Sequence, residues 1–205
     1  LLNCISYIGM SKTLEMLDGM FAFAVFDYKK NNLTLVRDRF GQKPLYYGWV
    51  NNNFVFSSEL KAFKKFRSFN NNLNLKALSL YFKFMYVPAP YSIYEEIYKL
   101  RPGYIIDISL QDNYFDIKNT NNYSSKYFTY KRWWSLEDQI IKSKNNKFSN
   151  YNERLNYLST SLEDTISDQL ISDVPVGCFL SGGIDSSIVT SIMSNVSSKK
   201  INTFS

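Results

Sequence analysis

Apolar residues in the first sixty positions occur in short runs separated by polar turns. Residues 20–27 and 33–37 form one such pair of runs, and residues 45–50 and 54–57 form another. Runs of this length, joined by turns rich in Asn and Lys, predict strands that pair antiparallel. Because nearly every residue in 20–27 is apolar, we expect that strand to be covered on both faces.

Helices are expected before and after these strands, where apolar residues recur every three or four positions. Ser58 is the expected N-cap of one helix, and Pro88 ends another together with the residue before it. Two further strands are expected on either side of the turn at 101–103. The predicted helices cover residues 2–10, 12–17, 58–66 and 75–82, and the two further strands cover 97–100 and 104–107.

The second half of the chain has a different pattern. Residues 111–149 are polar, and we place a linker at 142–150, which has no apolar period. Leucine and isoleucine spaced by three or four predict a helix over 151–172. A buried parallel strand is expected over 174–180, and 201–205 has the pattern of another strand. Helix, strand, loop, helix and strand in this order predict an open α/β sheet.

Composition excludes several classes of protein. The chain has 205 residues, 45% of them hydrophobic, which suits a folded core, and no apolar run approaches the ~20 residues that span a bilayer. Cys4 and Cys178 favour a reducing, cytoplasmic setting without disulfides. The absence of histidine excludes imidazole catalysis and histidine metal ligands within these residues. The net charge of +6 comes from dispersed basic residues, so nucleic acid is not an expected partner.

The segment that carries the most chemistry is the Ser-Gly-Gly loop, residues 181–187 (Ser-Gly-Gly-Ile-Asp-Ser-Ser). Gly182 and Gly183 allow positive φ and close approach of a ligand. The helix expected to start here offers free N–H groups to an anion, and Asp185 can hold a magnesium ion that bridges phosphate oxygens. The loop therefore predicts a pyrophosphate site. It lacks the lysine of a Walker A loop, and the alternative is an ordinary strand-to-helix turn.

The Ser-Gly-Gly loop resembles the pyrophosphate loop of ATP pyrophosphatases, which include several synthetases and some tRNA-modifying enzymes. Other segments narrow this choice, because they resemble glutamine-hydrolysing asparagine synthetases and follow the same order. These segments are residues 17–27, 37–47 (beginning Arg-Asp-Arg-Phe-Gly), 86–90, 99–103 and 172–177. The resemblance covers nearly the whole chain and is weakest over 111–149.

The resemblance implies two domains. Residues 1–141 would form the later part of an α+β amidotransferase sandwich of antiparallel sheets with its linker. Residues 151–205 would begin an α/β parallel-sheet ATP-pyrophosphatase domain. The implied reaction makes asparagine from aspartate, ATP and glutamine through β-aspartyl-AMP and ammonia transfer, with magnesium. The implied setting is the cytoplasm, without a membrane, and a homodimer is one option for assembly.

The resemblance also assigns residues. The family's glutaminase nucleophile is an N-terminal cysteine, which these residues do not include, so we expect no catalytic residue here and an internal fragment that is inactive alone. Cys4 is expected to be a small buried apolar residue instead. The residues expected to bind ATP and pyrophosphate are Phe179, Leu180, Ser181, Gly182, Gly183, Asp185, Ser186 and Ser187, with Asp185 also holding magnesium.

A second charged group is the Arg-Asp-Arg loop, residues 37–43, with Arg37, Asp38, Arg39 and Lys43. One interpretation places it at a domain interface and the ammonia path, and the other makes it an ion-pair network that shapes the loop. Trp133 and Trp134 are expected to pack in a core or an interface. The alternative functions are a related β-lactam-type synthetase, a tRNA-modifying ATP pyrophosphatase, and a remnant without catalysis.

Overall fold

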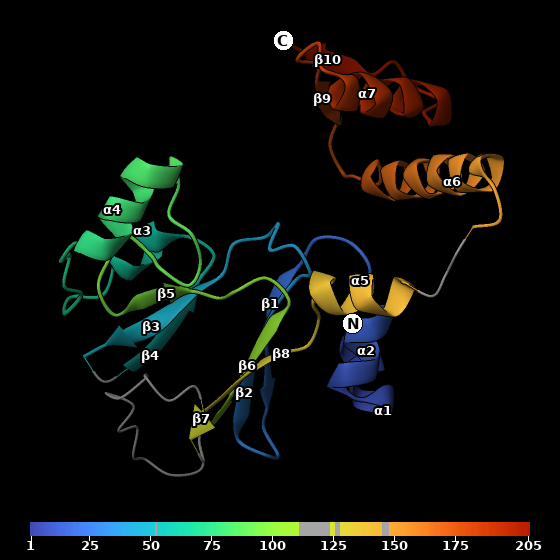
Figure 1. Cartoon of the computed structure of the whole chain (residues 1–205). Coiled ribbons are helices and arrows are strands. Elements are labelled where there is room, and N and C mark those ends of the chain that lie inside the picture. The colour runs from blue at the N-terminus through green and yellow to red at the C-terminus, as the bar shows by residue number, and fades with distance from the viewer. Residues whose placement is uncertain (52, 111–123, 126–127, 145–147) are drawn as a thin grey trace. The chain divides into compact units, whose positions relative to one another are not determined.

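The computed structural model describes residues 1–51, 53–110, 124–125, 128–144 and 148–205. The chain divides into two compact units, Leu1–Ile140 and Ile141–Ser205 (Figure 1). Residues 145–147 of the predicted linker and 111–123 of the predicted polar stretch lie outside the described residues.

The first unit contains two antiparallel sheets and several short helices. One sheet has the strand order β1-β2-β6-β8-β7, and the other has the order β4-β3-β5. The strands are β1 (Ala22–Asp27), β2 (Asn32–Arg37), β3 (Tyr46–Val50), β4 (Asn53–Ser57), β5 (Ile97–Lys99), β6 (Tyr104–Ser109), β7 (Ser124–Ser125) and β8 (Phe128–Arg132). The helices are α1 (Leu2–Ile8), α2 (Met10–Met16), α3 (Leu60–Phe63), α4 (Leu75–Phe84) and α5 (Leu136–Ser143). Helix α5 begins in the first unit and ends in the second.

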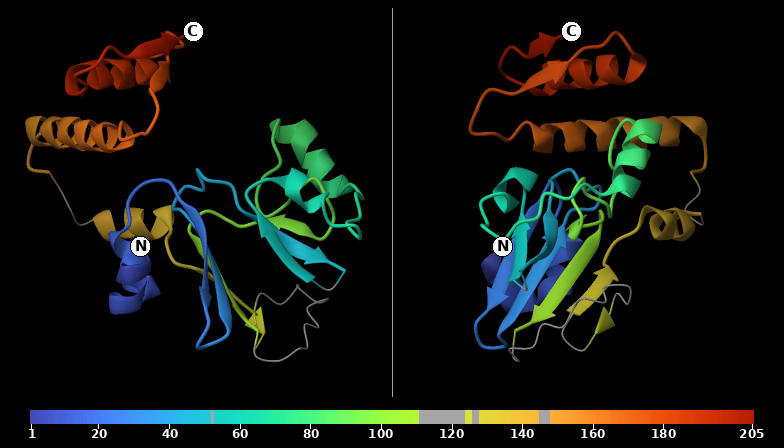
Figure 2. Two further views of the ribbon diagram at one scale, coloured as in Figure 1. Left: turned by 180° about the vertical axis from the view of Figure 1, so that it is seen from behind. Right: turned by 90° about the vertical axis from the view of Figure 1, so that its left-hand side faces the viewer.

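Alternation of side chains along the strands produces the layers of this unit (Figure 2). In β2, Leu35 lies in the core between the two sheets, together with Tyr47 of β3. The next residue, Val36, points to the opposite face and packs against Leu14 of α2. On the outer face of the smaller sheet, Phe63 of α3 packs on the strands in the same way. The order of layers is therefore helix, sheet, sheet and helix, and the predicted antiparallel sheets are confirmed.

Both predicted hairpins are present. β1 pairs with β2 from Ala22↔Arg37 to Asp27↔Asn32, and β3 pairs with β4. The strands on either side of the turn at 101–103 are present too, but β5 and β6 belong to different sheets. The chain therefore crosses from one layer of the sandwich to the other at this turn.

Three predictions about the first unit are wrong. β1 is not covered on both faces: Phe26 is 38% exposed, because β1 is the edge of a five-stranded sheet that faces only three strands. Ser58 is not the N-cap of α3, which begins one residue later with Glu59 as N-cap. Cys4 is exposed, because no residue of the short helix α1 is buried.

Three elements that begin in the first unit were not predicted. β7, β8 and α5 lie in the stretch that reads as polar in the sequence. β8 pairs with β6 from Tyr104↔Arg132 to Ile108↔Phe128, and Phe128 packs in the core between the sheets. α5 begins with the acidic residues Glu137 and Asp138, and the Ser135 hydroxyl accepts a hydrogen bond from the Asp138 N–H (3.3 Å). This first turn has the features of a capped helix start.

The second unit contains α6 (Tyr151–Gln169), β9 (Gly177–Phe179), α7 (Ile184–Val196) and β10 (Asn202–Phe204). α6 begins at Asn150, whose side chain accepts from the Glu153 N–H (2.9 Å), while Glu153 accepts from the Ser149 N–H (2.7 Å). β9 and β10 pair parallel, with α7 as the connection between them. No helix among the described residues is long and apolar enough to cross a membrane.

The predicted strand over 174–180 is shorter and less buried than expected. Only Gly177–Phe179 is a strand, and Phe179 is 83% exposed. The cause is the width of the sheet: within the described residues β9 has a single neighbour, β10, so most of its surface has no covering layer.

Candidate functional site

The Ser-Gly-Gly loop connects the end of β9 to the start of α7. The Leu180 N–H donates to the carbonyl of Phe204 in β10 (2.7 Å), which fixes the entry to the loop. Gly182 has φ +80°, while Gly183 has φ −78° and is the N-cap of α7. Only Gly182 therefore has the positive φ that glycine allows, and Gly183 does not.

The serine hydroxyls of the loop bond to one another and to the start of the helix. Ser181 Oγ lies 3.1 Å from Ser186 Oγ, so these two hydroxyls meet above the first turn of α7. The Ser186 and Ser187 hydroxyls each donate to the carbonyl of Gly183, at 3.1 and 2.8 Å. Ser181 and Ser186 therefore form a polar pair at the mouth of the loop, and Ser186 links this pair to the helix start.

Main-chain N–H groups are open at the same place. The Ser187 N–H bonds to the carbonyl of Gly183 (3.1 Å), and no hydrogen bond among the described residues uses the N–H groups of 181–186. Helix starts have such open donors, and the positive end of the helix dipole adds to their attraction for anions. The donor set therefore fits a phosphate group.

Asp185 lies exposed in the first turn of α7. The described residues contain no group of three or more Cys, Asp or Glu side chains that could hold a metal ion. Mg²⁺ commonly keeps several waters and takes one or two carboxylates together with phosphate oxygens. The single carboxylate therefore fits a magnesium ion that arrives with a phosphate-bearing substrate.

Thr190 of α7 helps to hold the Ser-Gly-Gly loop between β9 and α7, a role that was not predicted from the sequence. Its hydroxyl donates to the carbonyl of Ser186 (2.7 Å) and lies 3.3 Å from the sulfur of Cys178 in β9. Threonine four residues after Ser186 is the sequence signal that could have indicated this bond.

A hollow of about 280 Å³ in the second unit lies away from the loop. It is lined by the residues that precede β9, such as Asp173, and by those that precede β10, such as Lys199 and Lys200. The Ser-Gly-Gly loop follows the carboxyl end of β9, so loop and hollow lie at opposite ends of the two strands. In α/β sheets ligands bind at the carboxyl ends, which favours the loop.

The two glycines of the loop should respond differently to alanine. At Gly182 the positive φ makes any side chain strained, so Gly182→Ala should destabilise the loop by about 1–2 kcal/mol. At Gly183 the added Cβ would meet only Ser181 Oγ, at 3.7 Å, so Gly183→Ala is the matched control and should be close to neutral. Amide hydrogen exchange at Leu180 and Ser187, whose N–H groups are hydrogen-bonded on either side of the loop, measures both, and equal protection in the two variants would contradict this assignment of the strain.

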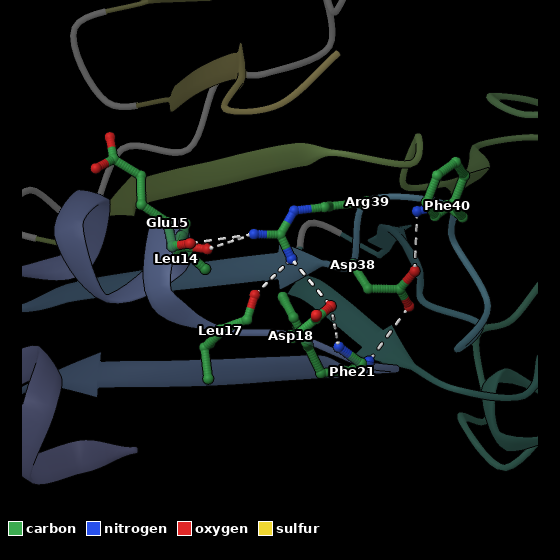
Figure 3. A network of polar contacts seen from close by, with 9 residues as sticks. Leu14, Glu15, Leu17, Asp18, Phe21, Asp38, Arg39 and Phe40 are labelled. Atoms are coloured by element: carbon green, nitrogen blue, oxygen red, sulfur yellow. Dashed lines mark hydrogen bonds and ion pairs between the residues drawn. The ribbon is translucent and has the colours of Figure 1, made fainter. Parts of the chain in front are cut away.

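Asp38 organises the Arg-Asp-Arg loop (Figure 3). Its side chain is buried. Its carboxylate accepts hydrogen bonds from four main-chain N–H groups, those of Phe21 (3.3 Å), Phe40 (3.1 Å), Gln42 (2.9 Å) and Lys43 (3.0 Å). One carboxylate thus ties the start of β1 to both ends of the loop.

Arg37 closes the loop from the other side. Its guanidinium donates to three carbonyls, those of Lys43 (2.8 Å), Leu100 (2.5 Å) and Gly41 (2.6 Å). Burial lowers the pKa of this guanidinium, while the neighbouring Asp38 raises it. Gly41 has φ +66°, and a Cβ there would lie 2.9 Å from the Arg37 guanidinium carbon, so the loop has room for glycine only.

Arg39 binds the segment that follows α2 (Figure 3). Its guanidinium donates to the carbonyls of Leu17 and Glu15, forms an ion pair with Asp18 (3.8 Å), and lies over the ring of Trp133 at 5.4 Å. Lys43, by contrast, contributes its main chain, and its side chain is exposed. The loop is therefore shaped mainly by hydrogen bonds to the main chain, and its role at a domain interface or ammonia path stays a prediction.

Trp133 and Trp134 both pack within the first unit. Trp133 lies beside Phe21, with ring centroids 6.1 Å apart, and its indole N–H donates to the carbonyl of Arg37 (3.2 Å). Trp134 meets Phe40 edge-on, with ring centroids 5.1 Å apart. These contacts give both rings a packing role.

Lys99 gives the first unit a measurable pH dependence. Its ammonium donates to the carbonyl of Val87 (2.7 Å), and burial, with a smaller effect from Arg37, lowers its pKa below the ordinary 10.5. Because the unfolded chain holds this proton to higher pH, stability should rise with pH in the window just below 10.5. Tyr46, whose pKa burial raises, acts in the opposite sense above pH 10.

Chemical denaturation between pH 8 and 10.5 should therefore show a smaller upward slope for Lys99→Met than for the unaltered chain. Tyr46→Phe is the control, because it removes only the opposing titration and should steepen the curve at the alkaline end. An unchanged slope in Lys99→Met would contradict the assignment of the pH dependence to this lysine.

Two models of known protein families match the chain. A family model described as a glutamine amidotransferase domain matches residues 1–123. The chain belongs to this family. A second model, described as asparagine synthase, matches residues 158–205 and so includes the Ser-Gly-Gly loop. Both parts of the resemblance stated from the sequence motifs are confirmed.

Individual relatives carry the same names. The chain is 38% identical, over 92% of its length, to a protein of Methanocaldococcus jannaschii named as a candidate glutamine-hydrolyzing asparagine synthetase 2. It is 30% identical over 91% of its length to glutamine-hydrolyzing asparagine synthetase 3 of Bacillus subtilis, and 32% identical over 86% to asparagine synthetase 1 of the same organism. The chain spans 33%, 27% and 24% of the length of these three relatives.

Proposed function

We propose that the full-length gene product makes asparagine from aspartate, ATP and the amide nitrogen of glutamine. One observation carries this proposal: a single chain joins the amidotransferase family to a Ser-Gly-Gly loop, and that loop lies inside the region that matches asparagine synthase. An amidotransferase domain releases ammonia, and an ATP pyrophosphatase domain activates the carboxylate that accepts it. The order of the two on the chain supports coupling of the two reactions.

In this proposal the second unit is the start of a parallel-sheet ATP-pyrophosphatase domain. The parallel pair of β9 and β10, with α7 between them, supports it. Residues 1–141 and 151–205 would then be the two domains, joined by the linker. The cytoplasmic setting and a homodimer remain part of the proposal.

The chemistry proposed for the Ser-Gly-Gly loop is charge stabilisation. Attack of the aspartate β-carboxylate on the α-phosphorus of ATP gives β-aspartyl-AMP, and pyrophosphate leaves with a large negative charge. The open N–H groups of Ser181, Gly182 and Gly183, with the hydroxyls of Ser181 and Ser186, would bind it. Asp185 would hold Mg²⁺, which supplies further neutralising charge. Phe179 and Leu180 would lie beside the adenosine.

The test is exchange of labelled pyrophosphate into ATP by the full-length gene product. The proposal predicts exchange that requires aspartate and magnesium. Exchange that requires tRNA and ignores aspartate would replace it with a tRNA-modifying function. Exchange with an aspartate analogue alone, followed by ring closure without ammonia, would indicate a β-lactam-type synthetase.

The residues of this chain are proposed to have no glutaminase activity by themselves. Its two cysteines are Cys4, exposed on α1, and Cys178 in β9, and neither is the N-terminal nucleophile of the family. Glutamate release by this polypeptide, measured with glutamine in excess, is expected to stay at the level without protein. Release above that level, abolished by Cys4→Ala, would contradict the proposal.

A further inference from the structure

A groove of about 530 Å³ in the first unit has no role in the proposed function. It lies where the Arg-Asp-Arg loop, the turn between β5 and β6, and the end of β8 come together, and each contributes an arginine: Arg39, Arg101 and Arg132. Phe40 and Trp134 add an aromatic pair to the lining. We call this feature the arginine groove.

The charge of the arginine groove is not balanced by its own lining. Among the described residues Glu137 is its one acidic lining residue, and it pairs with Arg132 (3.7 Å), which also bonds to Asp138 outside the groove (3.3 Å). Arg39 pairs with Asp18, also outside the groove (3.8 Å). Arg101 is therefore the lining arginine whose positive charge has no carboxylate partner among the described residues, and it can attract an anion into the groove.

The three guanidinium groups differ in what they already bind. Arg39 is held by main-chain carbonyls and by the carboxylate of Asp18, and Arg132 is held by two carboxylates. The half-buried Arg101 makes no side-chain hydrogen bond or ion pair with any described residue. Its main chain is fixed, because its N–H donates to the Tyr130 hydroxyl (3.4 Å). Arg101 thus offers its planar set of donors to a ligand.

We propose that the arginine groove binds a nucleotide, with the phosphate on Arg101 and the base against Phe40 and Trp134. Arginine binds phosphate through two parallel hydrogen bonds, and aromatic rings stack on bases. The volume of the groove lies within the range of small-molecule sites. All of its lining residues belong to the first unit, and none of them belongs to the Ser-Gly-Gly loop.

The test uses AMP and the fluorescence of Trp134 in this chain. Titration with AMP should quench tryptophan emission in a saturable way, and Trp134→Phe should remove most of the quenching. Arg101→Gln should weaken AMP binding about tenfold to a hundredfold, because a charged hydrogen-bond partner is lost. Arg67→Gln, which changes an exposed arginine outside the groove, should leave it unchanged.

A second variant and a second ligand distinguish binding in the arginine groove from binding at the Ser-Gly-Gly loop, and recognition of a nucleotide from recognition of a phosphate group alone. Asp185→Ala should not alter AMP quenching. Quenching that is lost in Asp185→Ala and kept in Arg101→Gln would place the nucleotide at the Ser-Gly-Gly loop and overturn the proposal. Ribose 5-phosphate should bind at least about tenfold more weakly than AMP, because it lacks the base. Equal binding of the two would overturn the nucleotide assignment.

Discussion

Replacement of Asp38 by alanine is expected to lower the free energy of unfolding of the first unit by about 3–5 kcal/mol, because four main-chain N–H groups lose a buried acceptor at once. The carboxylate accepts from four N–H groups and is 1% exposed. Arg37 would lose the neighbouring negative charge in the same step, and it too is buried.

Guanidinium denaturation followed by tryptophan fluorescence measures this effect, since Trp49, Trp133 and Trp134 all lie in the first unit. Asp27→Ala is the matched control. Asp27 accepts from two N–H groups in the exposed turn between β1 and β2, so its loss should cost less than about 1 kcal/mol. Asp38→Asn keeps the side-chain volume and one acceptor oxygen, so its loss of stability should lie between those of Asp38→Ala and Asp27→Ala. Equal losses for Asp38→Ala and Asp27→Ala would mean that the carboxylate does not organise the loop.

The second large effect is expected at Asp185. In the full-length gene product, Asp185→Ala should reduce ATP–pyrophosphate exchange about a hundredfold to a thousandfold, since charge on the leaving pyrophosphate would lose its magnesium. Asp164→Ala, an exposed aspartate on α6, is the control and should keep full exchange. Glutamine hydrolysis, measured as glutamate release, should be unchanged in both variants. Loss of both activities in Asp185→Ala would assign the residue a structural role.

The order of the elements could be read from the sequence because it depends on local signals. Hairpin β1–β2 follows from two apolar runs around a polar turn, and α6 follows from leucines spaced by three or four. Burial could not be read in the same way, because it depends on what lies across each element. Phe26 and Phe179 look like core residues, yet both are exposed, on an edge strand and in a narrow sheet.

The candidate sites show the same division. Loop residues 181–187 were identified from their own chemistry, and the structure brings Ser181 and Ser186 together. The partners of the Arg-Asp-Arg loop could not be foreseen, because Arg37 and Arg39 bind carbonyl oxygens, which every residue has. Arg101 had no motif to mark it, since only the meeting of three segments places it in a groove.

The central claim is that the Ser-Gly-Gly loop binds pyrophosphate, and amide chemical shifts test it most directly. Magnesium pyrophosphate is titrated into this chain while the backbone N–H resonances of the second unit are followed. Saturable shifts are expected that are largest at residues 181–186 and are strongly reduced in Asp185→Ala. Shifts that instead concentrate at Lys199 and Lys200, beside the hollow at the other end of the strands, would contradict it.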